Sequence, residues 1–372
     1  MSSVRAVELL QVELPLVRPF RTSFGEMRDK RCVLVRVETD DAEGWGECVA
    51  DAQPEFSEEF NDGAWLVLRD FLTPTLFRAG DVDVAGAEEA FRAVRGHPMA
   101  KAALIDALLD AELRASGTPL AAWLGAERDR VECGVSIGIA PSTEALLGQV
   151  AGFLAQGYRR IKLKIEPGLD VERVHAVRDA HPSILLSVDA NGAYTPSDAN
   201  VFLAMEDAEL LMIEQPLHHE DLVRHAELQA KLRTDLCLDE SIRSADDADA
   251  ALDLGACRVV NIKQGRVGGV LEAKRVHDRC RDRGVPVWCG GMLETGIGRA
   301  QNLALASLPG FTLPGDTSAS SRYFADDLTE AFELAADGTM EVPTGPGIGV
   351  VPRPERLRET VGRRELLTPD KE

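Results

Sequence analysis

Three acidic residues recur at equal intervals in the middle of the chain. Asp189, Glu214 and Asp239 are 25 residues apart, and each follows a short apolar run. A buried carboxylate without a counter-charge is costly, so such groups need a partner or a metal ion. Each acid could instead cap the next helix, but three acids in register favour a metal site. With no histidine or cysteine in the set, oxygen ligands suit Mg²⁺ or Mn²⁺ better than zinc.

Three lysines also lie at or near the ends of apolar runs. Lys162 and Lys164 lie two residues apart in the β-prone run RRIKLKIE, so both face the same side of the predicted strand, and Lys263 ends the run RVVNIK. A lysine acts as a base only if its pKa falls toward neutrality, and a nearby ammonium group or divalent cation lowers it. We therefore expect Lys162 to lower the pKa of Lys164. The alternative is that the lysines only form salt bridges with the acids.

Ser136 lies in GVSIG, which matches the G-x-S-x-G pattern of serine hydrolases. That pattern requires a sharp turn directly into a helix, whereas IGIAPSTEALL continues before the next helix begins. We therefore interpret Ser136 as a residue at a strand end, facing the same site as the acids and lysines.

The elements that must position these residues repeat at a period of about 25 residues, the length of a strand and a helix together. Helical stretches such as 221–233 and 270–284 separate the apolar runs, and Gly284 is expected to end the second of these. Continuous apolar runs of this kind are typical of a parallel sheet, and eight of them indicate a (β/α)₈-type barrel rather than an open sheet. In a barrel the strand ends converge on one mouth. The eight runs end at Ser136, Lys164, Asp189, Glu214, Asp239, Lys263, Gly291 and Asp316.

The first part of the chain follows a different pattern. Residues 1–125 read as an antiparallel meander followed by two helices, which predicts a separate α+β domain. A polar loop at about residues 18–28 separates the first two strands. The barrel is expected over residues 126–320, and the tail 321–372 is expected to return to the first domain.

Composition limits the partners and the compartment. The net charge of −21 argues against nucleic acid and anionic membranes. The seven cysteines form no metal-ligand spacing and several lie in apolar runs, so we expect buried free thiols in a reducing compartment. No signal peptide or membrane span is apparent, which predicts a cytoplasmic protein. We also expect a homo-oligomer.

Several motifs together resemble the enolase superfamily, in its muconate-cycloisomerase-like subgroup. They are KLK at 162–164, VDAN at 188–191, IEQP at 213–216, LDES at 238–241 and NIK at 261–263. The resemblance implies a modified (β/α)₇β barrel with an N-terminal α+β capping domain completed by the C-terminal tail, and a mobile substrate loop at about residues 18–28. It also implies one Mg²⁺, replaceable by Mn²⁺ or another divalent cation, on Asp189, Glu214 and Asp239. Lys164 and Lys263 would be the acid/base catalysts.

Within the subgroup, KLKIEPG, NIKQGRVGG, CGGMLETGIGRA and LPGDTSAS most closely resemble enzymes that form o-succinylbenzoate or racemise N-succinylamino acids. This resemblance implies a small-molecule carboxylate substrate. The reaction would be syn-dehydration of 2-succinyl-6-hydroxy-2,4-cyclohexadiene-1-carboxylate in menaquinone biosynthesis, racemisation, or both, through an enediolate formed by Lys164. A dedicated N-acylamino acid racemase, a dipeptide epimerase and a muconate cycloisomerase are alternatives. From other classes, a serine hydrolase using Ser136 and a non-catalytic barrel remain open.

Further residues are expected around the substrate. The two phenylalanines of the loop would cover it, Lys162 would contact its carboxylate, and a glycine–methionine pair would receive its succinyl tail. Glu240 and Arg266 are expected behind the lysines and metal ligands, where Arg266 would act on Lys263 unless it is solvated. The expected substrate-binding residues are Lys162, Ser136, Asn191, Gly291, Met292, Phe20 and Phe24.

Overall fold

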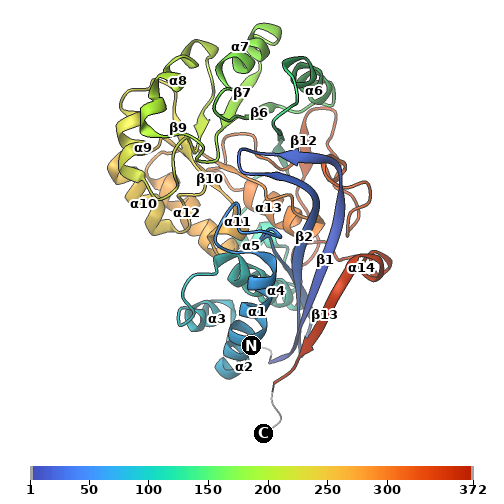
Figure 1. Cartoon of the computed structure of the whole chain (residues 1–372). Helices are drawn as coiled ribbons and strands as arrows, with labels where there is room; N and C mark the ends of the chain where they lie inside the picture. The colour runs from blue at the N-terminus through green and yellow to red at the C-terminus, as the bar shows by residue number, and fades with distance from the viewer. Residues whose placement is uncertain (1–2, 370–372) are drawn as a thin grey trace.

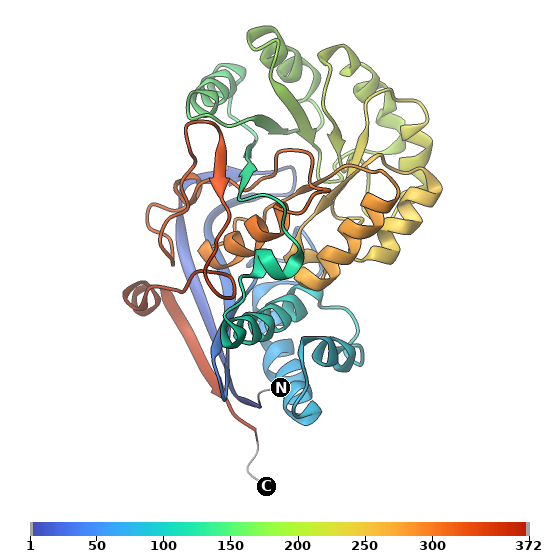
Figure 2. The same cartoon turned by 180° about the vertical axis from the view of Figure 1, so that it is seen from behind.

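The computed structural model describes residues 3–369 of the chain. It has an N-terminal part, whose helices gather at one end of the molecule, and a larger parallel barrel (Figure 1). The last strand returns beside the first strand, as Figure 2 shows from the opposite side. No helix among the described residues is long and apolar enough to cross a membrane.

The N-terminal part contains a four-stranded antiparallel sheet in the order β13-β1-β2-β3. Because β13 comes from the end of the chain and pairs with β1, the expectation that the tail completes the capping domain is confirmed. Its strands are β1 (Val4–Arg21), β2 (Glu26–Thr39), β3 (Glu43–Cys48) and β13 (Val361–Leu367). Its helices are α1 (Asn61–Val67), η1 (Leu68–Leu72), α2 (Thr73–Ala79), α3 (Val84–Phe91), α4 (Pro98–Ser116) and α5 (Leu120–Leu124).

Helix α4 packs closely against β3 because β3 carries glycines at the contact. A Cβ atom on Gly46 would lie 2.0 Å from the carbonyl oxygen of Ala103, and one on Gly44 would lie 2.2 Å from that of Ala107. Only glycine allows the two backbones to approach this far.

The polar segment at residues 18–28 is mostly a β-hairpin rather than a loop. Phe20 pairs with Met27 and Arg21 pairs with Glu26, so only residues 22–25 form the turn. The polar composition of the segment concealed its strands, since this end of the hairpin reaches beyond the core. The hairpin thereby carries Phe20 and Phe24 to the barrel.

The barrel is a seven-stranded parallel sheet in the order β11-β10-β9-β8-β7-β6-β5. An eighth segment closes the ring, because Phe311 bridges to Val287 of β11 and Gly315 bridges to Cys133 beside β5. The predicted (β/α)₇β architecture is therefore confirmed. Its strands are β5 (Gly134–Ile137), β6 (Arg160–Lys164), β7 (Leu185–Asp189), β8 (Ile213–Glu214), β9 (Leu236–Leu238), β10 (Val259–Ile262) and β11 (Val287–Cys289).

Helices follow the barrel strands. They are α6 (Thr143–Ala155), α7 (Val171–Ala180), α8 (Ala199–Leu203), α9 (Leu222–Gln229), α10 (Ala245–Leu254), α11 (Gln264–Val267), α12 (Val270–Asp282) and α13 (Gly296–Ala306). As predicted, Gly284 follows the end of α12 with φ of 69°. The helix expected over 221–233 ends earlier, at Gln229. The remaining elements are a small pair of strands, β4 (Arg130–Glu132) and β12 (Thr339–Glu341), helix α14 (Pro354–Thr360), and the 3-10 helices η2 (Pro196–Asp198), η3 (Glu206–Ala208) and η4 (Ser320–Arg322).

Two carboxylates of the N-terminal part bind the N-termini of barrel helices. Glu47 of β3 accepts hydrogen bonds from the backbone N–H groups of Thr295 and Gly298 at the start of α13. Asp106 of α4 accepts one from the N–H of Val270, the first residue of α12. Helix N-termini carry unpaired donors and partial positive charge, so these contacts dock the two parts together.

All seven cysteines are buried and free, which confirms the expectation drawn from their apolar surroundings.

Candidate active site at the barrel mouth

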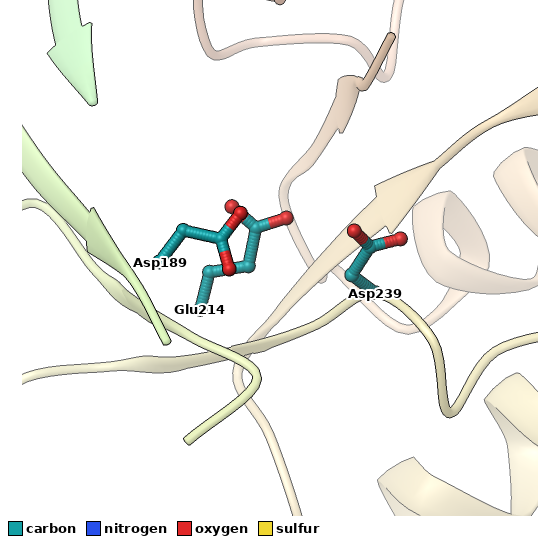
Figure 3. A group of neighbouring side chains, drawn as sticks. All are labelled: Asp189, Glu214 and Asp239. Atoms are coloured by element: carbon teal, nitrogen blue, oxygen red, sulfur yellow. The ribbon is translucent and has the colours of Figure 1, made fainter. Parts of the chain in front are cut away.

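The three equally spaced acids converge at the ends of neighbouring strands. Asp189 of β7 pairs in register with Glu214 of β8, and Asp239 directly follows β9. All three side chains are fully buried, and one oxygen from each lies within 4.8 Å of the others. Figure 3 shows the carboxylates of Asp189 and Glu214 side by side, with Asp239 beyond them on the neighbouring strand.

This arrangement fits a divalent cation. Burial and the adjacent Asp189 raise the pKa of Glu214 to about 8, which indicates that the charged form of this carboxyl is disfavoured in the absence of a metal ion. Burial also opposes ionisation of Asp189, but the ammonium groups of Lys164 and Lys162 hold its pKa well below the usual range. Carboxylate oxygens are hard ligands, which Mg²⁺ and related cations prefer.

Lys162 is enclosed by carboxylates. Its ammonium nitrogen lies 2.8 Å from Asp316, 2.9 Å from Glu214 and 3.2 Å from Asp189, and 4.7 Å from the centre of the Trp288 ring. Burial opposes its charge, yet these carboxylates raise the pKa of Lys162 well above its ordinary value. These ion pairs favour the charged form of Lys162. The tuning that it was expected to exert on its neighbour stays a prediction.

Lys164 is held by two acceptors. Its ammonium nitrogen lies 2.6 Å from an oxygen of Asp189 and 2.6 Å from Oδ1 of Asn191. Asn191 donates from Nδ2 to Glu240 at 2.8 Å, which fixes its amide with the oxygen toward Lys164. Glu240 thus acts on the lysine through Asn191.

Lys263, which follows β10, contacts the triad at Asp239, whereas Lys164 contacts it at Asp189. The ammonium nitrogen of Lys263 lies 2.7 Å from Asp239 and 4.4 Å from the centre of the Phe56 ring. Burial disfavours the ammonium form, but Asp239 outweighs it and raises the pKa of Lys263. The other oxygen of Asp239 pairs with the guanidinium of Arg266.

Arg266 is buried rather than solvated. It also donates to the backbone oxygens of Asn261, at 2.7 Å, and Ile242, at 2.8 Å. It reaches Lys263 through the shared carboxylate of Asp239 and not by direct contact.

A cavity of ≈ 380 Å³ opens above these groups, between the barrel mouth, the hairpin and the segment 51–56. The structure brings all the expected substrate-binding residues to this one cavity, and their individual roles stay predictions. From the predicted set, the cavity is lined by Phe20, Phe24, Ser136, Lys162, Lys164, Asn191, Lys263, Gly291 and Met292.

Ser136 does not have the surroundings of a hydrolase nucleophile. Its hydroxyl is buried without a hydrogen-bond partner among the described residues, and its neighbour in register is Lys162. A serine nucleophile needs a base within hydrogen-bond reach. The geometry therefore gives no support to the serine-hydrolase alternative.

The sequence analysis gave no role in the site to two residues, Asp316 and Phe56. Asp316 holds Lys162 and also Arg160, whose guanidinium lies 2.6 Å away. It ends the eighth apolar run, so the same signal that pointed to the triad was present. Phe56, which covers Lys263, lies in a segment with no periodic pattern and gave no such signal.

Comparison with known families agrees with this geometry. Residues 4–125 match the mandelate racemase/muconate lactonizing enzyme N-terminal domain, and residues 145–356 match the enolase C-terminal domain-like family. The chain therefore belongs to the enolase superfamily. Enzymes of this superfamily use a divalent metal ion, and the buried triad can hold one.

Particular relatives are similar over almost the whole chain. An N-succinylamino acid racemase from Amycolatopsis sp. is 56% identical over 354 residues, covering 95% of this chain and 96% of that protein. An o-succinylbenzoate synthase from Geobacillus kaustophilus is 50% identical over 348 residues, covering 93% of each. A solved enolase-superfamily member from Listeria innocua has a TM-score of 0.95 and 39% identity, with 100% of both chains covered. The chain is an enzyme of this superfamily.

Proposed function

We propose that this enzyme forms o-succinylbenzoate by Mg²⁺-dependent syn-dehydration of 2-succinyl-6-hydroxy-2,4-cyclohexadiene-1-carboxylate in menaquinone biosynthesis, and that it also racemises N-succinylamino acids. The observation that carries the proposal is the placement of two lysines around one triad. Lys164 ends β6 and contacts Asp189, whereas Lys263 follows β10 and contacts Asp239, with three strands between them in the sheet. Two such groups can serve the two faces of one substrate carbon.

Bound Mg²⁺ would stabilise the negative charge that develops on the substrate carboxylate. Lys164, as the neutral amine, takes the proton from the α-carbon while Asn191 orients it. In the dehydration, Lys164 then returns this proton to the departing β-hydroxyl, which leaves as water, and Lys263 stays a cation beside the enediolate. In the racemisation, Lys263 instead gives its proton to the opposite face of the α-carbon.

Charge balance at the mouth supports an anionic substrate. The connected network contains equal numbers of acidic and basic side chains, and Lys164 is neutral when it takes the proton, so a bound divalent cation leaves an excess of positive charge that a substrate carboxylate would offset. Lys162 lines the cavity, and its ion pairs favour the charged form, so we propose it as a contact for the substrate carboxylate. The acids are Asp189, Glu214, Asp239, Glu240 and Asp316, and the bases are Arg160, Lys162, Lys164, Lys263 and Arg266.

The remaining cavity residues complete the proposed site. Phe20 and Phe24 on the hairpin would exclude water from the reacting carbon. Gly291 and Met292, after β11, would let the succinyl group approach the backbone. Ser136 would contact the substrate from β5.

We also propose the division of the chain into a capping domain (1–125), a catalytic barrel (126–320) and a C-terminal segment (321–372) that returns to the cap. The pairing of β13 with β1 and the cavity shared by cap and barrel support this division. We further propose a cytoplasmic protein, since the seven buried thiols are free. We also propose a homo-oligomer, because barrels of this kind often associate.

The test is a side-by-side assay with Mg²⁺ of the cyclohexadiene substrate, N-succinylamino acids, dipeptides and muconate. Formation of o-succinylbenzoate, and entry of solvent deuterium at the α-carbon of an N-succinylamino acid, are the expected results. Turnover of only dipeptides or muconate would move the assignment to another member of the superfamily. Absence of Mg²⁺ binding in calorimetry would overturn the metal-dependent mechanism.

A further inference from the structure

Gln215 directly follows Glu214 of the triad and has no role in the proposed mechanism. It lies in the motif IEQP at 213–216, and its side chain is fully buried. Its φ of 38° lies in the left-handed region, which residues other than glycine rarely adopt. Backbone strain of this kind persists where the surrounding contacts enforce it, and it is concentrated at functional sites.

The backbone of Gln215 is bonded to the segments that carry the other two acids of the triad. Its N–H donates to the carbonyl oxygen of Cys237 at 2.8 Å, two residues before Asp239. Its carbonyl oxygen accepts a hydrogen bond at 2.7 Å from the N–H of Gly192, three residues after Asp189. One residue therefore joins the ends of three neighbouring strands at the metal site.

The side-chain amide of Gln215 holds the backbone on both sides of Glu240. Its Oε1 accepts hydrogen bonds from the N–H of Asp239, at 3.0 Å, and from the N–H of Ser241, at 3.2 Å. Its Nε2 donates to Oγ of Ser241 at 2.8 Å and to the carbonyl oxygen of Leu217 at 3.2 Å, which fixes the orientation of the amide. A buried N–H group without an acceptor is costly, so these bonds fix the segment 239–241 relative to Gln215.

These contacts reach both the metal site and the lysine that takes the proton. The N–H of Asp239 belongs to the residue whose carboxylate completes the triad, so the amide sets where that side chain begins. Glu240, between the two bonded N–H groups, accepts a hydrogen bond from Asn191, which in turn holds Lys164. A shift of the segment 239–241 would therefore move a metal-site carboxylate and loosen Lys164 together.

We propose that Gln215 is a positioning residue for the metal site, whose left-handed backbone and side-chain amide together hold Asp239 opposite Asp189 and Glu214. The amide atoms of Gln215 are engaged by the protein, so it acts on the metal ion through Asp239. The inference rests on the proposed function in one respect only, the binding of Mg²⁺ at the triad.

The test compares wild type with Gln215→Met, which keeps a side chain of similar length but removes the amide. Loss of a hydrogen bond that orients a metal ligand commonly weakens metal binding 10- to 100-fold, so calorimetry should show Mg²⁺ affinity lowered by about that factor. With Mn²⁺ as a spectroscopic probe, the electron paramagnetic resonance spectrum of the variant should broaden, because the ligand geometry becomes less uniform. Ser241→Ala, which removes one of the two acceptors of Nε2, should give a smaller loss of Mg²⁺ affinity.

Gln229→Met is the matched control. Gln229 is also a buried glutamine whose amide binds the backbone, since it accepts from the N–H of Leu236 at 2.7 Å and donates to the carbonyl oxygen of Thr234 at 3.1 Å. These contacts lie at the start of β9, the opposite end of that strand from Asp239. Both glutamine variants should be less stable to urea in EDTA, whereas only Gln215→Met should lose Mg²⁺ affinity and change the Mn²⁺ spectrum.

Three outcomes decide the proposal. Equal Mg²⁺ affinity in wild type and Gln215→Met, or an equal loss in the two glutamine variants, would overturn it, since Gln215 would then have a structural role only. If Gln215→Met does not fold, Ser241→Ala replaces it in the comparison with Gln229→Met, and unchanged Mg²⁺ affinity in Ser241→Ala overturns the proposal. Failure of the wild type to bind Mg²⁺ would refute the proposed function and this proposal with it, whereas the first two results leave the proposed function standing.

Discussion

The ammonium group of Lys162 lies 2.8 Å from a carboxylate oxygen of Asp316. Two of the three carboxylates around Lys162, Asp189 and Glu214, belong to the triad that would bind the metal, so Asp316 is its partner outside the metal site. Asp316 also binds the fully buried Arg160 at 2.6 Å. The two cations outweigh burial and hold the pKa of Asp316 well below its usual range.

Replacing Asp316 with asparagine should therefore weaken both the fold and the chemistry. Arg160 loses its ion pair in a buried position, and breaking such a pair costs about 3 kcal/mol of unfolding free energy. Lys162 would compete more strongly for the triad, so kcat/KM should fall about 10- to 100-fold. Urea unfolding and steady-state kinetics measure the two effects. Asp326→Asn, at an exposed ion pair with Arg353, should change neither, and equal behaviour of the two variants would refute the role of Asp316.

Removing Lys263 should separate proton abstraction from racemisation. In Lys263→Ala, Lys164 still reaches one face of the α-carbon, whereas the opposite face has no proton donor. We expect racemisation to fall by at least about 100-fold while one enantiomer keeps exchanging its α-proton with solvent deuterium. Proton NMR in heavy water follows both. Lys274→Ala, at an ion pair on α12, serves as the control. Exchange from both enantiomers at equal rates would contradict the two-base assignment.

Metal binding should be separable from folding. In the structure the triad is already paired with Lys162, Lys164 and Lys263, so chelation with EDTA should abolish activity yet leave the protein folded.

Glu214→Gln extends this test. The substitution should weaken Mg²⁺ binding by about 100-fold or more, since it removes a ligand. Because burial makes the charge of Glu214 unfavourable, the unfolding free energy in EDTA should change by only about 1 kcal/mol. Calorimetry and chemical unfolding give the two values. Unfolding of the wild type by EDTA would show that the metal is structural instead.

The sequence was sufficient for the barrel because strand and helix repeat at a constant interval. That interval placed Asp189, Glu214 and Asp239 at consecutive strand ends, where the parallel register then brings them together. The family motifs added the two catalytic lysines. Both the interval and the order of the motifs can be read from the sequence without knowledge of contacts between distant segments.

What the sequence did not reveal depends on contacts between distant segments. Lys162 was expected mainly to tune its neighbour, but its surroundings are set by Asp316, 154 residues away, which no local pattern connects to it. The segment at 18–28 was expected to be a loop because its residues are polar. They are polar because this end of the hairpin leaves the core and covers the barrel mouth. Phe56 lies over Lys263 only because the cap and barrel dock.

The docking of cap and barrel should itself depend on pH through Asp106. Burial raises the pKa of this carboxyl to about 7 in the folded protein, and its Oδ2 has no hydrogen-bond partner among the described residues. In the unfolded chain its pKa is about 4. Between these values the folded state holds the extra proton, so the unfolding free energy falls as pH rises from about 4 to about 7.

Asp106→Asn should remove this dependence. The amide oxygen can still accept the hydrogen bond from Val270 at the start of α12, but it carries no charge at any of these pH values. The variant should therefore gain stability over wild type as pH rises to about 7, by a difference on the order of 2–4 kcal/mol, and the difference should stay constant above that. Urea unfolding at pH 5 and pH 8 measures it. Asp282→Asn, exposed on α12, should show no such change. If the stability difference between Asp106→Asn and wild type is the same at both pH values, Asp106 is ionised throughout and its charge stabilises the cap of α12.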